Sequence, residues 1–107
     1  MIFVSMDIEA KPGGRDILIA AMQKMATTTR SEAGCIAYTF SAGLADPDRF
    51  HLVEIWENEE LMDAHIDADD AGVFVGVLNE HGRITSVKAF EGEARKFRIR
   101  APKPRLV

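Results

Sequence analysis

The chain has 107 residues, 47% of them hydrophobic and 28% charged, which fits one ordinary globular domain. One cysteine excludes an internal disulfide, and no apolar run approaches the roughly 20 residues that a membrane-spanning helix needs. The net charge of −4 divides unevenly, because residues 1–94 hold 7 basic and 17 acidic side chains, whereas residues 95–107 hold six basic ones and no acid. We therefore predict a domain over 1–94 and a basic tail over 95–107. The tail is expected to pack on an acidic body, its own or a partner's, and not on nucleic acid or a membrane.

The N-terminal stretch alternates apolar and polar residues from Ile2 to Glu9, which predicts a half-buried strand. It has no basic segment ahead of an apolar run, so we expect no signal peptide and a cytoplasmic protein. A Pro-Gly-Gly turn follows at 12–14. Residues 15–30 then place their apolar side chains in one stripe, which predicts a helix packed on one side.

Two further strands are predicted in the middle of the chain. In 35–41, the side chains of Ile36, Tyr38 and Phe40 should share one face. After a turn that contains Pro47, residues 49–57 form a strand that should pair antiparallel with it. Both faces of the third strand are largely apolar, so both should be covered.

The C-terminal half of the domain begins with Asn58, a good helix N-cap followed by acidic residues. A short helix should run to about residue 66, and a second helical stripe continues to Glu80 or His81. Gly82 is the expected residue after its C-terminus. Residues 84–91 alternate again and predict a fourth strand.

The resulting order, βαββαβ, predicts an α+β ferredoxin-like fold with a four-stranded antiparallel sheet and helices on one face. The other face has apolar residues and no further domain to cover it. We therefore expect a second copy of the chain to supply the covering sheet, which makes the protein a homodimer.

Several motifs in the same order and spacing cover residues 1–91. They are Lys11-Pro12-Gly13, then SEAGCIAY at 31–38, DPDRF at 46–50, EIWENEEL at 54–61 and Asp63-Ala64-His65. In these motifs the chain resembles the antibiotic biosynthesis monooxygenase (ABM) domain family. The resemblance implies a dimeric α+β barrel with a mostly apolar pocket between sheet and helices, and it leaves the tail outside.

The family resemblance implies a cofactor-independent monooxygenase that oxidises a small aromatic or quinol-type substrate with O2, the substrate supplying the electrons. Two alternatives stay open. A non-catalytic dimeric domain that binds small molecules or serves a stress response would have its pocket filled by side chains. An enzyme acting on a small phosphorylated signal compound would need basic groups in the pocket.

Haem-degrading enzymes of similar fold need an Asn on the first strand, a Trp on the short helix and an axial His about ten residues later. This chain offers Met6 or Asp7, His65 and Val75 at those places, so the resemblance implies no haem, and no other cofactor is expected. The spacing of His51, His65 and His81 does not suit a metal site either.

Two residues are the candidate catalytic groups. His65, on the inner side of the short helix, titrates near neutrality and could accept a phenolic proton. It could equally be a packing histidine that bonds to backbone or to Glu54. Glu54 lies among apolar neighbours in a strand, where a carboxylate must be paired. An ion pair with Arg49, Lys88 or His65 competes with a role as general base.

Four residues are the candidate substrate-binding set: Tyr38, Trp56, Met6 and Phe74. The aromatic rings could line a site for an aromatic ligand, with the Tyr38 hydroxyl as a donor. Trp56, Tyr38 and Phe74 also suit a purely structural role, since large aromatic side chains dominate cores and interfaces.

Overall fold

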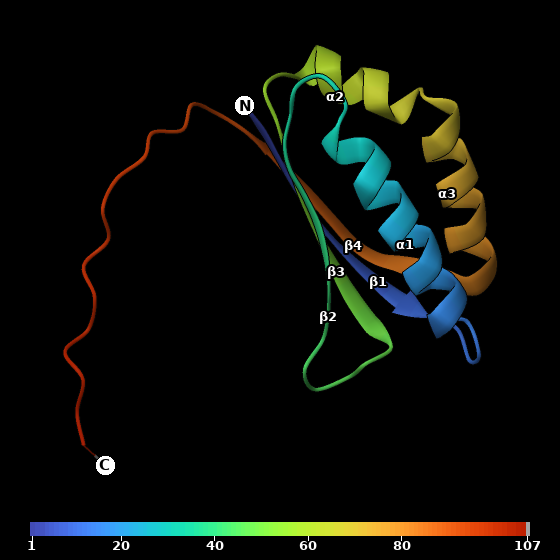
Figure 1. The fold of residues 1–107 in the computed structure, drawn as a ribbon, viewed down its shortest axis with the longest axis horizontal. Coiled ribbons are helices and arrows are strands. Elements are labelled where there is room, and N and C mark those ends of the chain that lie inside the picture. The colour runs from blue at the N-terminus through green and yellow to red at the C-terminus, as the bar shows by residue number, and fades with distance from the viewer. Residues whose placement is uncertain (107) are drawn as a thin grey trace.

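Figure 1 shows the protein as a computed structural model, in which residues 1–106 are described. In chain order the elements are β1 (Ile2–Ala10), α1 (Arg15–Arg30), β2 (Cys35–Ala42), β3 (Arg49–Trp56), α2 (Glu59–Ile66), α3 (Asp69–His81) and β4 (Gly82–Glu91). The strands form one antiparallel sheet in the order β2-β3-β1-β4. The predicted α+β ferredoxin-like fold is confirmed, with boundaries within about two residues of those expected.

The three helices cover one face of the sheet, and the opposite face has no helix on it (Figure 1). The core lies between these layers, where Ile8 and Leu52 from the sheet meet Leu18 and Leu78 from the helices, all four almost fully buried. Burying each such side chain contributes roughly 1.5–3 kcal/mol. Because the helices lie on one face of the sheet, a pocket can form between the sheet and the helices. No helix in the described part of the chain is long and apolar enough to cross a membrane.

Strand β2 does not follow the predicted alternation throughout. Its register against β3 shifts between Cys35 and Ala37, which marks an irregularity of the β-bulge kind. Because of this shift Cys35 packs against the core, whereas Ile36 is about half exposed. The prediction that Ile36 shares a face with Tyr38 and Phe40 is therefore wrong at Ile36, while Tyr38 and Phe40 both pack towards the core.

Two glycines fix how helices meet the sheet. Gly34 has φ +80°, and a Cβ there would overlap the side chain of Leu61 in α2. Gly82 directly follows the last residue of α3, as predicted, but its backbone is extended and not left-handed. A Cβ at Gly82 would lie 2.8 Å from the Glu9 carbonyl oxygen and 2.9 Å from Leu18 Cδ1, so the close approach of β4 to β1 and α1 explains the glycine.

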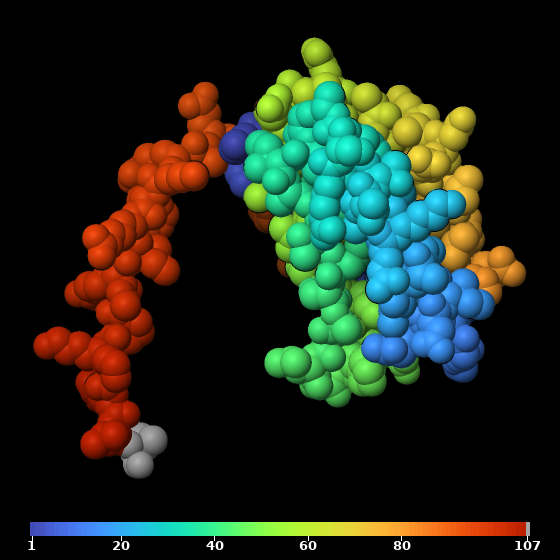
Figure 2. Space-filling model, in the orientation of Figure 1, coloured from blue at the N-terminus to red at the C-terminus, as the bar shows by residue number. Residues whose placement is uncertain are grey.

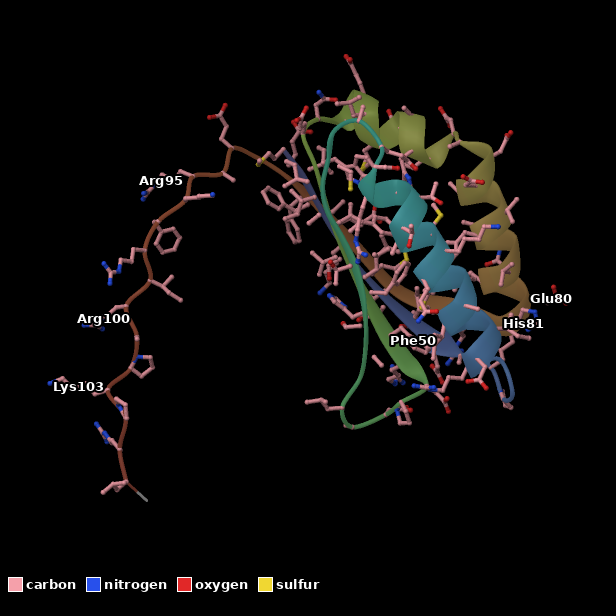
Figure 3. All side chains as sticks on the ribbon, viewed as in Figure 1. Phe50, Glu80, His81, Arg95, Arg100 and Lys103 are labelled. Atoms are coloured by element: carbon pink, nitrogen blue, oxygen red, sulfur yellow. The ribbon has the colours of Figure 1, made fainter. Side chains whose placement is uncertain are left out.

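Residues 92–106 leave the end of β4 and run clear of the domain on the side of the uncovered sheet face (Figures 1 and 2). Figure 3 shows Arg95, Arg100 and Lys103 along this segment, far from the helices. The radius of gyration is 16.0 Å, against about 13 Å for a compact chain of this length. Among the described residues, none from 93 onward forms a hydrogen bond or ion pair with the domain, so the tail does not pack on its own body, and packing on a partner's body stays a prediction.

Candidate active site

A cavity of about 330 Å³ lies between the sheet and helices α2 and α3. We call it the His65 cavity. Five of the six predicted site residues line it: Met6, Tyr38, Glu54, His65 and Phe74. Trp56 does not line it but is fully buried behind it. The topology brings these residues together because β1, β3 and β2 are neighbours in the sheet and all direct alternate side chains towards the helices.

His65 belongs to the last turn of α2, whose start is fixed by Asn58. The Asn58 side-chain oxygen accepts a hydrogen bond of 2.9 Å from the Leu61 backbone N–H, so the predicted cap is confirmed. The His65 side chain is 7% exposed, and its Nδ1 lies 3.1 and 3.3 Å from the two carboxylate oxygens of Glu32. Nδ1–H therefore donates to Glu32, and Nε2 is the ring nitrogen left for a ligand.

Two aromatic side chains hold the His65 ring in place. The Trp56 ring lies 4.9 Å from it, at an interplanar angle of 32°. The Tyr38 ring meets it edge-on at 5.5 Å. Such contacts fix ring orientation as well as burying area. Trp56 thus has the structural role that its size suggests, and its ring contacts the candidate base His65.

Glu54 is a buried carboxyl that has a neutral hydrogen-bond donor as its partner. Trp56 Nε1–H donates to its Oε1 at 2.9 Å, and the group is 7% exposed. Burial is the largest influence and raises the pKa of Glu54, as does the charge of Glu32, while the Trp56 hydrogen bond and nearby His65 lower it. The net shift is upward, which favours the protonated form.

The expected partners Arg49 and Lys88 do not reach Glu54. Arg49 lies near the carboxylates of Glu9 and Asp46, at 3.6 and 3.5 Å. Lys88 pairs in register with Ser5, on the sheet face away from the helices. Strand alternation puts both cations on the wrong face, so the prediction of an ion pair with either is wrong.

Tyr38 is 3% exposed and lines the cavity. Burial raises its pKa well above the usual range, and the charges of Glu54 and Glu32 raise it further. It therefore stays a neutral phenol that can donate or accept a hydrogen bond. Phe74 completes the aromatic wall, with its ring 5.7 Å from that of Phe40.

Glu32 was not among the predicted site residues. It lies just after α1, 33 positions before His65 in the sequence. Its position in the motif at 31–38 was the only signal in the sequence, and that motif does not say which side chain Glu32 contacts. The contact exists because the chain reverses at Gly34 and passes under α2.

The cavity combines an imidazole nitrogen, a carboxyl that favours its protonated form and a phenol, within apolar walls. This set can take a proton from a ligand and hydrogen-bond the oxygen left behind. The cavity is not filled by side chains, which was the condition attached to a non-catalytic domain. None of the described residues that line it is Lys or Arg, the groups that a phosphorylated compound would need. No cluster of metal-binding side chains occurs within residues 1–106.

A second hollow of about 370 Å³ lies between α1 and β2. It is more open than the His65 cavity, and Arg30 is the one ionisable side chain among its described lining residues. It therefore lacks the combination of acid and base groups found under α2.

Comparison with known proteins places this geometry in a family. The sequence profile described as antibiotic biosynthesis monooxygenase matches residues 1–76. A structure from Deinococcus radiodurans assigned to the antibiotic biosynthesis monooxygenases is similar, with TM-score 0.80 and 26% identity over 91% of this chain and 98% of that one. A Bacteroides thetaiotaomicron protein of unknown function, suggested to be an oxidoreductase, gives TM-score 0.80 and 25% identity over 85% of this chain and 96% of its own.

One curated relative is the uncharacterised protein sll1783 from Synechocystis sp., 34% identical over 64 residues. That match covers 60% of this chain but only 44% of the relative, so the relative is much longer than the matched region. The profile match spans most of the chain and includes β1 to β3 and the His65 helix. The resemblance inferred from the motifs is thereby confirmed, and the chain belongs to the antibiotic biosynthesis monooxygenase family.

Proposed function

We propose that the protein is a cofactor-independent monooxygenase that oxidises a small aromatic or quinol-type substrate with O2 in the His65 cavity. The observation that supports this most is the His65 ring itself. It is buried, its Nδ1 is held by Glu32, it lines a largely apolar cavity, and no group within residues 1–106 forms a hydrogen bond with its Nε2. Family membership supports the same class of reaction.

In this proposal His65 Nε2 accepts the proton of a substrate hydroxyl, which leaves an electron-rich aromatic anion. The anion supplies the electrons that reduce O2, a carbon–oxygen bond forms, and the resulting hydroperoxide loses water. One oxygen atom stays in the product and the other leaves as water, so the substrate is the reductant. The protein contributes the base, the orientation and a cavity that excludes bulk water.

Glu54 and Tyr38 would stabilise the substrate oxygen. Burial raises the pKa of Glu54, and in its protonated form the carboxyl can donate a hydrogen bond to the developing anion, while Trp56 Nε1–H donates to its Oε1. The neutral Tyr38 hydroxyl can do the same. Hydrogen-bond donors fixed in a dry site where charge develops contribute strongly to rate.

Oxygen uptake with a panel of hydroquinones and anthrones tests the proposal. We expect turnover by the wild-type chain and a loss of at least about 100-fold in His65→Ala, the effect typical of removing a general base. His81→Ala is the matched control, since His81 lies at the far end of α3, outside the cavity lining (Figure 3). Absence of turnover with every substrate, or equal rates in wild type and His65→Ala, would contradict the assignment.

We also propose that the protein works as a homodimer joined through the uncovered sheet face. Phe3 pairs across strands with Ile55 and Phe90 on this face, and Phe90 is 65% exposed. Exposed apolar side chains grouped on one face favour a protein partner, and a second copy of the same sheet packs on it with matching twist.

The cytoplasm is the compartment that we propose. Burial raises the pKa of the single thiol, Cys35, as do the carboxylates of Glu32 and Glu54. A single cysteine that remains a free thiol is typical of a protein in a reducing compartment.

A further inference from the structure

The polarity of the His65 cavity changes along its length. Its ionisable side chains, Tyr38, Glu54 and His65, are all buried, at 3%, 7% and 7% exposed. The large lining side chains that are also exposed to solvent form what we call the cavity mouth. These are Ile66, Val75, Ile84 and Val87, with exposed fractions of 57%, 45%, 39% and 55%.

The four residues of the mouth come from three elements, α2, α3 and the edge strand β4, and all four are aliphatic. A cavity for a wholly polar ligand would have polar groups where the ligand meets water. Here the order is reversed, with hydrogen-bonding groups innermost and apolar side chains outermost. Apolar side chains grouped at a cavity entrance mark a site where apolar ligand surface is removed from water.

The size of the cavity also indicates a ligand that is partly apolar and extends into the mouth. About 330 Å³ is near the lower limit of pockets that enclose a whole drug-sized molecule. An aromatic head of one or two rings would occupy the inner part, so any larger substituent must leave through the mouth. That substituent would then lie against Val75 of α3 and Val87 of β4.

We propose that the ligand of this cavity is amphipathic: an aromatic head with hydroxyl or carbonyl oxygens at the inner end, and an alkyl or prenyl-type chain that leaves across the mouth. The inference of an aromatic head rests on the proposed function, whereas the inference of an alkyl substituent rests only on the residues of the mouth. An anionic substituent is disfavoured, because none of the described lining residues is Lys or Arg.

Binding of matched 1,4-naphthoquinones tests the proposal without turnover. The 2-methyl and 2-pentyl compounds differ by four methylene groups, and each methylene fully removed from water strengthens binding by about fourfold. Because the chain is only partly covered at a mouth, we expect Kd, followed by Trp56 fluorescence, to fall about tenfold or more from methyl to pentyl.

Variants of the mouth localise the effect. In Val75→Ser and Val87→Ser, separately and together, the ratio of the two Kd values should fall to about threefold or less. Val73→Ser is the control, since Val73 is on the same helix and 66% exposed but does not line the cavity, and it should keep the wild-type ratio. Circular dichroism verifies that each variant is folded. If the double variant is not folded, the Kd ratios of the two single variants provide the test.

Three results would overturn the proposal. If both compounds bind with equal Kd, the ligand has no alkyl substituent that contacts the mouth, and the proposed function is unaffected. Failure of both compounds to bind would reject the aromatic head as well. Finally, a change of molecular mass in Val75→Ser or Val87→Ser, measured by light scattering, would show that the mouth is covered by another copy of the chain and not by a ligand.

Discussion

The contact between Glu32 and His65 decides which ring nitrogen of the candidate base is left for a ligand. With Nδ1 at 3.1 and 3.3 Å from the two carboxylate oxygens, the ring is held in one tautomer. Glu32→Ala removes the partner, and Glu32→Gln keeps an oxygen acceptor without the charge. We expect kcat to fall roughly 10- to 100-fold in Glu32→Ala, by analogy with the loss of a carboxylate that orients a metal-binding histidine.

Nitrogen-15 NMR of His65 separates this role from a purely structural one. The wild-type spectrum should show protonated Nδ1 and unprotonated Nε2, and Glu32→Ala should show a mixture of tautomers. Glu60→Gln serves as the control, because Glu60 is exposed on the same helix as His65. An unchanged tautomer in Glu32→Ala would refute the orienting role.

Glu54 gives a pH dependence of stability. Its pKa is raised above the ordinary value of 4.5, so the folded state binds the proton more tightly than the unfolded state. The free energy of unfolding must then decrease as pH rises from about 4.5 to the folded-state pKa, by about 1.4 kcal/mol for each pH unit between the two values, and level off above it.

Urea denaturation across pH 4–9 checks this behaviour. In Glu54→Gln the amide oxygen can still accept from Trp56, and the decrease assigned to Glu54 should disappear, so the variant gains stability relative to wild type as pH rises. Glu60→Gln should retain the wild-type profile. A Glu54→Gln profile parallel to wild type would mean that the Glu54 pKa is not raised.

At the scale of elements, helix α2 is positioned by the close approach of the chain at Gly34. A side chain there would have φ +80° and overlap Leu61. We expect Gly34→Ala to lower the free energy of unfolding by about 2–4 kcal/mol, from the left-handed backbone and from overpacking. The same change should weaken ligand binding, because α2 carries His65.

Gly72→Ala is the opposite case and the control. Gly72 lies inside α3, and a Cβ there would meet no described atom within 4 Å beyond the backbone of its own helix, so alanine should stabilise the helix by about 0.5–1 kcal/mol. Thermal denaturation of both variants measures the contrast. A Gly34→Ala protein as stable as wild type would show that α2 does not depend on this approach.

The helices and strands could be predicted from the sequence, whereas several contacts between them could not. Periodicity and the Asn58 cap predict every helix and strand, since these depend on local pattern. The irregular register at Cys35 and the extended Gly82 depend on neighbouring strands, so local pattern misses them. Likewise the cavity residues could be named singly, but the Glu32 contact and the Trp56–Glu54 bond join side chains whose meeting the sequence does not specify.

For the whole molecule, the uncovered sheet face makes the second copy testable. We expect light scattering to give twice the chain mass of 11.8 kDa for the wild type. Phe90→Asp, which buries a charge in the proposed interface, should shift the mass to that of one chain. Val73→Asp on the outer side of α3 is the control. A wild-type protein of single-chain mass at micromolar concentration would contradict the proposed dimer.

In the proposed reaction the His65 cavity brings an aromatic substrate together with O2, and the substrate is the reductant. Mass spectrometry of the product formed under oxygen-18 gas, by protein freed of metal ions with a chelator, tests it most directly. We expect one oxygen-18 atom in each product molecule, the other in water, and at least about 100-fold less labelled product with His65→Ala. Product without label, or labelled product formed equally fast by His65→Ala, would contradict the account.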